Sequence, residues 1–226
     1  MMQPCPRLLV FDMDGTLTDT LPVMVETMNS AIRAVTNSAP PAEALVREGL
    51  GVELLETVQA LLPDQSAALH DAVVQHYCAT YRGIEAEMGL RLFPGVFAAL
   101  EILQARGFML AIGTGKSRAG LERVMPLLGL QHLFRWSRTA DETAHKPDPT
   151  MLHELMAVSA CGAVETLMIG DTSFDVHMAH AAGVRSVALH SGTHSAARLA
   201  AARPTLTLTS VAHLPAHLFS GPAQAR

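Results

Sequence analysis

The stretch that decides the fold is Leu8-Leu9-Val10-Phe11-Asp12-Met13-Asp14-Gly15-Thr16-Leu17. Four apolar residues run into two aspartates, a glycine and a threonine, which predicts a buried strand that ends in a tight loop. In an extended segment the side chains of residues i and i+2 point to the same side. The carboxylates of Asp12 and Asp14 would therefore repel each other unless one is protonated or a cation lies between them.

This acidic loop has two interpretations. Asp and Gly are favoured in turns, so the stretch from Asp12 to Gly15 could be an ordinary turn. Alternatively, the two carboxylates belong to a site for Mg²⁺, which prefers oxygen ligands and is commonly held by one or two carboxylates beside a substrate phosphate. That second interpretation predicts phosphoryl chemistry, and three features further along the chain favour it.

The composition describes a globular chain. It has 226 residues, of which 49% are hydrophobic and 16% charged, enough for one large domain or for a core with a smaller module. The formal net charge of −5 argues against general nucleic-acid binding, which needs a basic face. We find no apolar run of about 18 residues and no signal-peptide pattern, and therefore expect a cytoplasmic protein with no membrane partner.

The segment between the first strand and about Leu90 is predicted to be helical throughout. Apolar residues recur at helical spacing over 21–35, 54–62 and 69–80, and the first two of these stretches end at prolines. No convincing strand lies between them. We therefore expect a helical module inserted directly after the first strand, with its apolar stripes explained by ordinary core packing.

The remainder of the chain alternates between strand and helix. Helical patterns over 96–103, 121–128 and 176–182 alternate with short apolar runs at 108–112, 166–169 and 184–189, and a last short run follows at 205–208. This alternation predicts an α/β fold, a Rossmann-like, doubly wound and mostly parallel sheet with helices on both faces.

Polar clusters directly follow three of the predicted strands. Besides Asp12 and Asp14 these are Thr114 with Gly115, and Asp171 with Asp175. Ligands of doubly wound sheets bind at the carboxyl ends of the strands, so one site would contain all three clusters. Lys146 lies in a loop before a helix and could join them.

Two familiar nucleotide motifs are excluded. Gly115-Lys116-Ser117 resembles part of a phosphate-binding P-loop, but Leu110 stands where that loop needs its first glycine. The dinucleotide fingerprint fails as well, because Arg118 occupies the position of its third glycine.

Taken together, the four clusters resemble the motifs of the haloacid dehalogenase (HAD) superfamily. Its first motif, DxDGT, is similar to residues 12–16, its second to Thr114, its third to Lys146 and its fourth, GDxxxD, to residues 170–175. The resemblance covers essentially the whole chain, and the inserted helices resemble the C1-type cap of phosphoglycolate phosphatases and β-phosphoglucomutases. It implies a catalytic core of residues 1–17 and 91–226 and a helical cap of residues 18–90.

The resemblance also implies a role for each motif residue. Asp12 would be the nucleophile and form an aspartyl-phosphate, and Asp14 would be the general acid and base. Mg²⁺ would be held by the Asp12 carboxylate, the Asp14 backbone carbonyl and Asp171, with Asp175 ordering the surroundings of the ion. The remaining implied residues are the phosphate-binding Thr114, Gly115 and Lys146, and Arg47 and Lys116 as possible substrate contacts.

The expected function is a Mg²⁺-dependent phosphatase of small phosphomonoesters of the phosphoglycolate or sugar-phosphate type, with a small phosphorylated metabolite as its partner. Asp14 favours phosphoryl transfer over dehalogenation, since dehalogenases of the superfamily lack this second acid. A phosphosugar mutase shares the cap type and stays an alternative, and an inactive binding module is a second one. The sequence leaves the substrate and the oligomeric state open.

Overall fold

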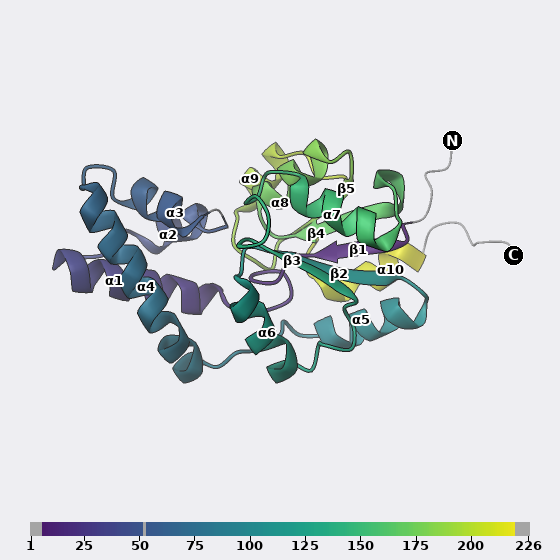
Figure 1. Cartoon of the computed structure of the whole chain (residues 1–226), viewed down its shortest axis with the longest axis horizontal. Helices are drawn as coiled ribbons and strands as arrows, with labels where there is room; N and C mark the ends of the chain where they lie inside the picture. Colours follow the sequence, from purple (N-terminus) through teal and green to yellow (C-terminus); the bar gives the residue numbers. More distant parts are fainter. Residues whose placement is uncertain (1–5, 52, 220–226) are drawn as a thin grey trace, which may run out of the picture.

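The computed structural model describes residues 6–51 and 53–219. Figure 1 shows two parts side by side, a core built on a sheet and a group of helices, α1 to α4, that projects from one end of it. We call these four helices the helical module. They are α1 (Leu21–Thr36), α2 (Glu43–Gly49), α3 (Leu54–Leu61) and α4 (Ala67–Met88).

The core contains a six-stranded sheet in which every pair of neighbours is parallel. The strands lie in the order β3-β2-β1-β4-β5-β6. In the centre, Leu8 of β1 is in register with Met109 of β2 on one side and Thr166 of β4 on the other. The strands are β1 (Leu8–Phe11), β2 (Met109–Thr114), β3 (Trp136–Thr139), β4 (Thr166–Gly170), β5 (Arg185–Leu189) and β6 (Leu206–Leu208).

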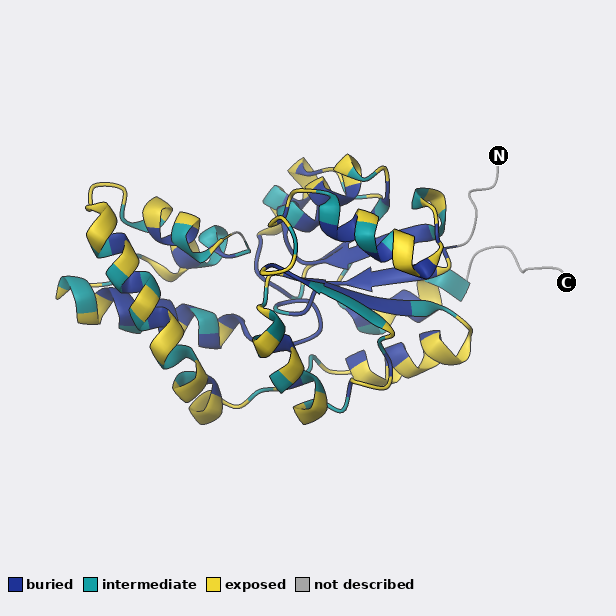
Figure 2. Ribbon diagram, in the orientation of Figure 1, coloured by how far each residue is buried: buried dark blue, intermediate teal, exposed yellow. Residues whose placement is uncertain are grey.

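Helices cover both faces of this sheet, which confirms the doubly wound α/β architecture. Side chains alternate along β1, so Leu9 and Phe11 pack on one face with α5 (Val96–Ala105) and α6 (Arg118–Leu127). Leu8 and Val10 pack on the other face with α7 (Thr150–Ser159) and α8 (Ser173–Ala181). The central strands are accordingly buried along their length in Figure 2.

The remaining elements close the carboxyl-terminal half of the core. Helix α9 (Ala196–Ala201) packs through Leu199 against Val176 and Ala188. Two short 3-10 helices, η1 (Ala163–Glu165) and η2 (Val211–His213), and α10 (Leu214–Phe219) complete the order. None of the helices in the described part of the chain is long and apolar enough to cross a membrane.

Strand β3 and helix α2 are among the elements that the sequence pattern does not predict. Strand β3 is Trp136-Ser137-Arg138-Thr139, and only Thr139 of the four is fully buried. An edge strand pairs on one side only and carries no continuous apolar run, so its pattern did not stand out. Helix α2 is seven residues long and buries a single side chain, Val46, which is too little for a helical stripe.

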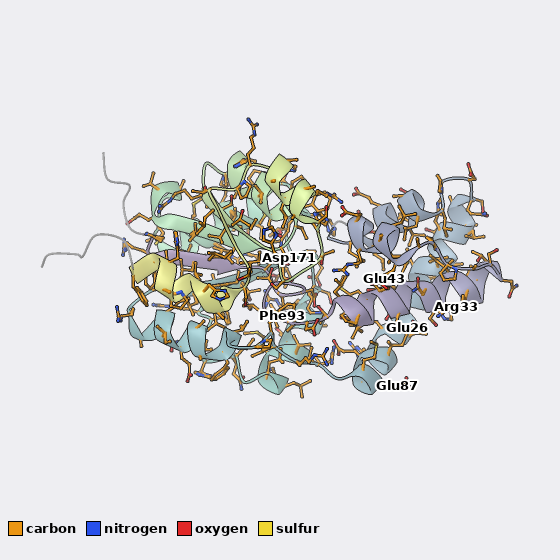
Figure 3. The ribbon with its side chains drawn as sticks, turned by 180° about the vertical axis from the view of Figure 1, so that it is seen from behind. Glu26, Arg33, Glu43, Glu87, Phe93 and Asp171 are labelled. Atoms are coloured by element: carbon orange, nitrogen blue, oxygen red, sulfur yellow. The ribbon has the colours of Figure 1, made fainter. Side chains whose placement is uncertain are left out.

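The helical module has a hydrophobic core of its own, formed mainly between α1 and α4. Its two connections to the sheet run side by side, because Thr18 bridges to both Asp14 and Leu92, and Asp19 pairs with Arg91 at 2.7 Å. Seen from behind in Figure 3, Asp171 lies in the core on the side that faces the module, whereas Glu26, Arg33 and Glu87 lie on the module's helices.

Candidate active site

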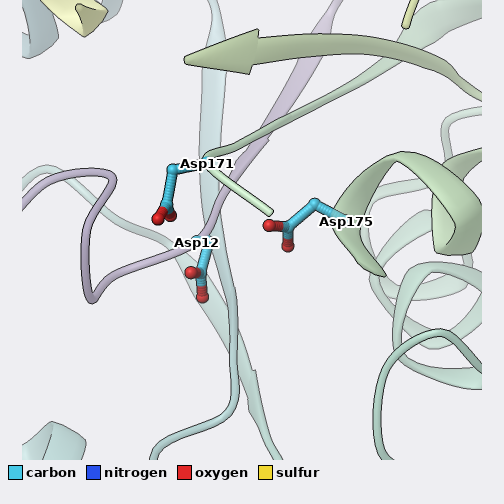
Figure 4. Close-up of side chains that lie close together, drawn as sticks. All are labelled: Asp12, Asp171 and Asp175. Atoms are coloured by element: carbon cyan, nitrogen blue, oxygen red, sulfur yellow. The ribbon is translucent and has the colours of Figure 1, made fainter. Parts of the chain in front are cut away.

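Three aspartates converge at the carboxyl ends of the central strands. Asp12 follows β1, Asp171 follows β4 and Asp175 lies in the first turn of α8. One carboxylate oxygen from each lies within 4.8 Å of the others, and all three residues are buried (Figure 4). The parallel pairing of β1 with β4 brings their ends together, although 155 positions separate Thr16 in the first loop from Asp171.

Lys146 supplies the positive charge of this cluster. Its ammonium Nζ lies 2.8 Å from Asp12 Oδ1 and 2.7 Å from Asp175 Oδ1, and the side chain is only 5% exposed. Burial by itself would lower the pKa of Lys146, but the two carboxylates outweigh burial and hold the pKa above its usual value. Lys146 is therefore a permanent cation that joins two of the three acids.

Asp171 is held by hydrogen bonds on both of its carboxylate oxygens. Thr16 Oγ1 donates to Oδ1 and the backbone N–H of Thr193 donates to Oδ2, each at 2.7 Å. The loops that supply these two donors pass so close to the Asp171 carboxylate that only glycine fits at one position in each loop. A Cβ would lie 2.3 Å from the Asp171 carboxylate at Gly15, whose φ is +79°, and 2.2 Å from it at Gly192. This packing fixes the direction in which the carboxylate points.

The pKa values of two of these aspartates indicate that the cluster would be stabilised by a bound cation. Burial raises the pKa of Asp12 to about 7, with Lys146 lowering it and the neighbouring acids raising it further. Burial and then repulsion from Asp175 raise the pKa of Asp171 to about 6. Buried carboxylates that are destabilised in their ionised form gain from a bound cation, and an all-oxygen donor set suits Mg²⁺. The residues present therefore fit a divalent metal.

Asp14 lies beside this cluster but in a different environment. It is half-buried, accepts a hydrogen bond from Thr20 Oγ1 at 2.8 Å and pairs with Lys116 at 2.8 Å. Its carboxylate is thus oriented by groups from the start of α1 and from the loop after β2. Only one residue separates Asp12 from Asp14, yet Asp12 lies in the buried cluster of acids and Asp14 lies in a half-buried site beside it.

A cavity of about 480 Å³ opens between the core and the helical module. Its core side includes Asp12, Asp14 and Lys146, together with Thr114 and Gly115 of the loop after β2. Thr114 is buried, and its hydroxyl accepts a hydrogen bond from the Lys116 backbone N–H at 3.2 Å. Its module side comes from α1, α3, α4 and the loop between α2 and α3.

The sequence profile of the haloacid dehalogenase-like hydrolases matches residues 9–189, most of the chain. The chain is a member of this family.

Named relatives of this hydrolase are similar over nearly its full length. A probable phosphatase, IndB, of Dickeya dadantii is 32% identical over 202 residues, covering 87% of this chain and 86% of the relative. A phosphoglycolate phosphatase of Pseudomonas syringae pv. tomato is 31% identical, covering 92% and 78%. The crystal structure of a predicted phosphoglycolate phosphatase from Haemophilus somnus superposes with a TM-score of 0.83 at 25% identity, covering 94% and 98%.

The hydrolase brings together all but one of the residues predicted from the sequence. Arg47 does not line the cavity; its guanidinium pairs with Glu43 at 3.7 Å and reaches the Gly192 carbonyl at 3.5 Å. Lys116 does line it. The sequence pattern does not single out Gly192 and Thr193, although they follow β5 much as the cluster of Thr114 and Gly115 lies at the end of β2.

Proposed function

We propose that this hydrolase is a Mg²⁺-dependent phosphatase that cleaves small phosphomonoesters through an aspartyl-phosphate. The observation that carries the proposal is that Asp12, Asp14 and Lys146 face one cavity beside a three-carboxylate cluster. A nucleophile, a second acid and a fixed cation that face one cavity are what phosphoryl transfer requires. The phosphatase names of the relatives at 32% and 31% identity support the same chemistry.

Asp12 is the proposed nucleophile. Lys146 holds Oδ1, which keeps the carboxylate in one orientation while the second oxygen attacks phosphorus. The P–O bond to the leaving alcohol breaks as the new P–O bond to Asp12 forms, and water then hydrolyses the acyl phosphate. Splitting the displacement in two lowers each barrier.

Asp14 is the proposed general acid and base. Thr20 and Lys116 orient its carboxyl group toward the cavity without burying it among the other acids. It would protonate the leaving oxygen in the first half-reaction and take a proton from the attacking water in the second. Such proton transfers contribute roughly 10²- to 10⁴-fold to the rate.

Mg²⁺ would be held by the carboxylates of Asp12 and Asp171 and by the backbone carbonyl of Asp14, with Asp175 ordering its surroundings. When bound, the ion neutralises charge on the phosphoryl group. Thr114, the Gly115 amide and Lys146 would bind the remaining phosphoryl oxygens, where charge develops in the transition state. These donors supply positive potential in a protein whose net charge is −5.

We further propose that residues 18–90 form a cap over a catalytic core made of residues 1–17 and 91–226. The separate hydrophobic core of α1–α4 and the paired connections at Thr18 and Leu92 support this division. Closure of the cap would exclude bulk water while the aspartyl-phosphate exists.

The test is release of phosphate from a panel of phosphomonoesters, including phosphoglycolate and hexose phosphates, in Mg²⁺ and in EDTA. Asp12→Asn should fold normally and lose turnover, because an amide is a poor nucleophile, whereas Asp71→Asn on the exposed side of α4 is the matched control. Turnover that survives in Asp12→Asn would refute the assignment of the nucleophile. Isomerisation of β-glucose 1-phosphate without net release would favour the mutase.

A further inference from the structure

Two tyrosines of α4 form a wall of the cavity. Tyr77 and Tyr81 both line it, with ring centroids 5.7 Å apart and ring planes inclined by 36°. Met24 of α1 and Leu54 of α3 line the same cavity and belong to or pack on the same hydrophobic cluster. The module therefore presents rings and alkyl groups to the cavity, beside the polar Glu53, Thr57 and Arg82.

This wall begins next to the proposed acid. The ammonium of Lys116 lies 5.5 Å from the centre of the Tyr81 ring and 2.8 Å from the Asp14 carboxylate. In the proposed mechanism Asp14 protonates the oxygen of the leaving group, and Tyr81 lies on the same side of the cavity as Asp14 and Lys116, within reach of the body of that group. Burial raises the pKa of both tyrosine hydroxyls, so the two rings are uncharged.

The cavity is larger than a phosphorylated two-carbon acid needs. At about 480 Å³ it lies within the size range of pockets that hold drug-sized ligands. A phosphate with a two-carbon acid would leave the tyrosines, Met24 and Leu54 facing water. Filling that space with apolar atoms is favourable because it removes apolar surface from water.

One of the charged side chains that line the same cavity is already paired with a carboxylate of the protein. Arg123 of α6 is paired with Glu85 of α4, a buried carboxylate that is only 2% exposed. This ion pair joins the module to the core beside the tyrosine wall. Arg82 also lines the cavity and could meet a polar edge of the ligand, but the rings and alkyl groups decide the character of the wall.

We propose that the natural substrate has a leaving group with an aromatic or extended apolar body that packs on Tyr77 and Tyr81, larger than the glycolate of phosphoglycolate. This inference rests on the proposed phosphatase function and narrows its substrate class. It makes the two tyrosines specificity-determining residues, since they contact the body of the leaving group and not the reacting phosphate.

The test compares kcat/KM for 2-phenylethyl phosphate and ethyl phosphate in Mg²⁺. Both esters release a primary alcohol, so the pair differs mainly in the phenyl ring. We expect the ratio to be about 10- to 100-fold in favour of the phenyl compound, the range expected for burying one phenyl ring. We also expect phosphoglycolate to be a poorer substrate than 2-phenylethyl phosphate.

Variants localise the effect. Tyr81→Ala and Tyr77→Ala should each lower the ratio several-fold, whereas Tyr81→Phe should keep it because the ring remains. Gln75→Ala on the exposed face of α4 is the control and should leave the ratio unchanged. A ratio near one in the unaltered enzyme, or preference for phosphoglycolate over 2-phenylethyl phosphate, would overturn the inference while leaving the phosphatase proposal intact.

Binding of non-hydrolysable analogues separates this inference from the proposed function. Calorimetry with 3-phenylpropylphosphonate and propylphosphonate should show the same preference as turnover does. No hydrolysis of any ester together with a retained binding preference would refute the phosphatase proposal alone. Equal affinities of the two phosphonates would overturn the tyrosine wall as a binding surface.

Discussion

Replacing Lys146 with Met tests the electrostatic account of the site. The substitution keeps most of the side-chain volume and removes the ammonium that lies 2.8 Å from Asp12 and 2.7 Å from Asp175. Neither carboxylate has another ion-pair partner among the described residues. In the variant, buried carboxylates within 4.8 Å of one another would face each other without a cation.

The expected loss of stability is large. Removing one partner of a buried ion pair costs roughly 3–5 kcal/mol, because the remaining charge stays buried and uncompensated. For a chain of this length that corresponds to a fall in Tm of about 6–20 °C, at ~2–4 °C per kcal/mol. The loss should be smaller in Mg²⁺, since a bound cation would restore part of the missing positive charge.

The assay is urea unfolding at about pH 8 in EDTA and in excess Mg²⁺. At this pH the Asp12 and Asp171 carboxyls of the unaltered protein, whose pKa values are about 7 and 6, are ionised. Lys116→Met is the matched control. Lys116 pairs with the half-buried Asp14, which keeps its hydrogen bond from Thr20, so the loss of stability should be clearly smaller. A loss below about 1 kcal/mol for Lys146→Met in EDTA, the size of a surface pair, would refute the reasoning.

Three further outcomes are expected. In EDTA, the pKa values of Asp12 (about 7) and Asp171 (about 6) are raised in the folded state, which therefore holds protons that the unfolded state has released. The contribution of these two carboxyls to the free energy of unfolding is full below about pH 4 and is lost as the pH rises toward 7. Urea unfolding against pH should show this slope, and saturating Mg²⁺ or Asp171→Asn should flatten it; an unchanged slope in that variant would contradict the assignment. Gly192→Ala should lower kcat/KM by about 10²-fold because its Cβ would lie 2.2 Å from the Asp171 carboxylate and displace it, whereas Gly83→Ala, with nothing within 4 Å, should leave the steady-state kinetics unchanged. Arg91→Ala should cost less than about 1 kcal/mol in urea unfolding, since its pair with Asp19 is solvent-exposed, and a larger loss would show that the paired connections carry more of the stability than the ion pair does.

The amino-acid sequence alone predicted the parts of the structure that depend on local pattern. Successive side chains of a strand point to opposite faces, and in β1 both faces are apolar, Leu9 and Phe11 on one and Leu8 and Val10 on the other. This pattern predicts a strand that is buried on both sides. The same reasoning predicted α1, α3 and α4 and the strands that end in polar residues. Strand β3 escaped it because pairing with β2, and not its own composition, holds Trp136–Thr139 in the sheet.

The site shows the same division. Because the carboxyl ends of parallel strands meet at one edge, the sequence predicted that Asp12, Thr114 and Asp171 would lie together. Three features of the site depend instead on where loops far apart in the sequence pass one another. Lys146 bridges two acids, the Thr193 amide donates to Asp171, and Arg47 lies outside the cavity.

Tyr77 illustrates the physical reason most clearly. Its helical spacing along α4 predicts an ordinary core residue, and the residue is indeed only 8% exposed. Periodicity reports which face of a helix is removed from water, but not whether that face meets another side chain or a cavity. Only the tertiary structure, by placing α4 opposite Asp14 and Lys116, decided that this apolar stripe lines the candidate active site.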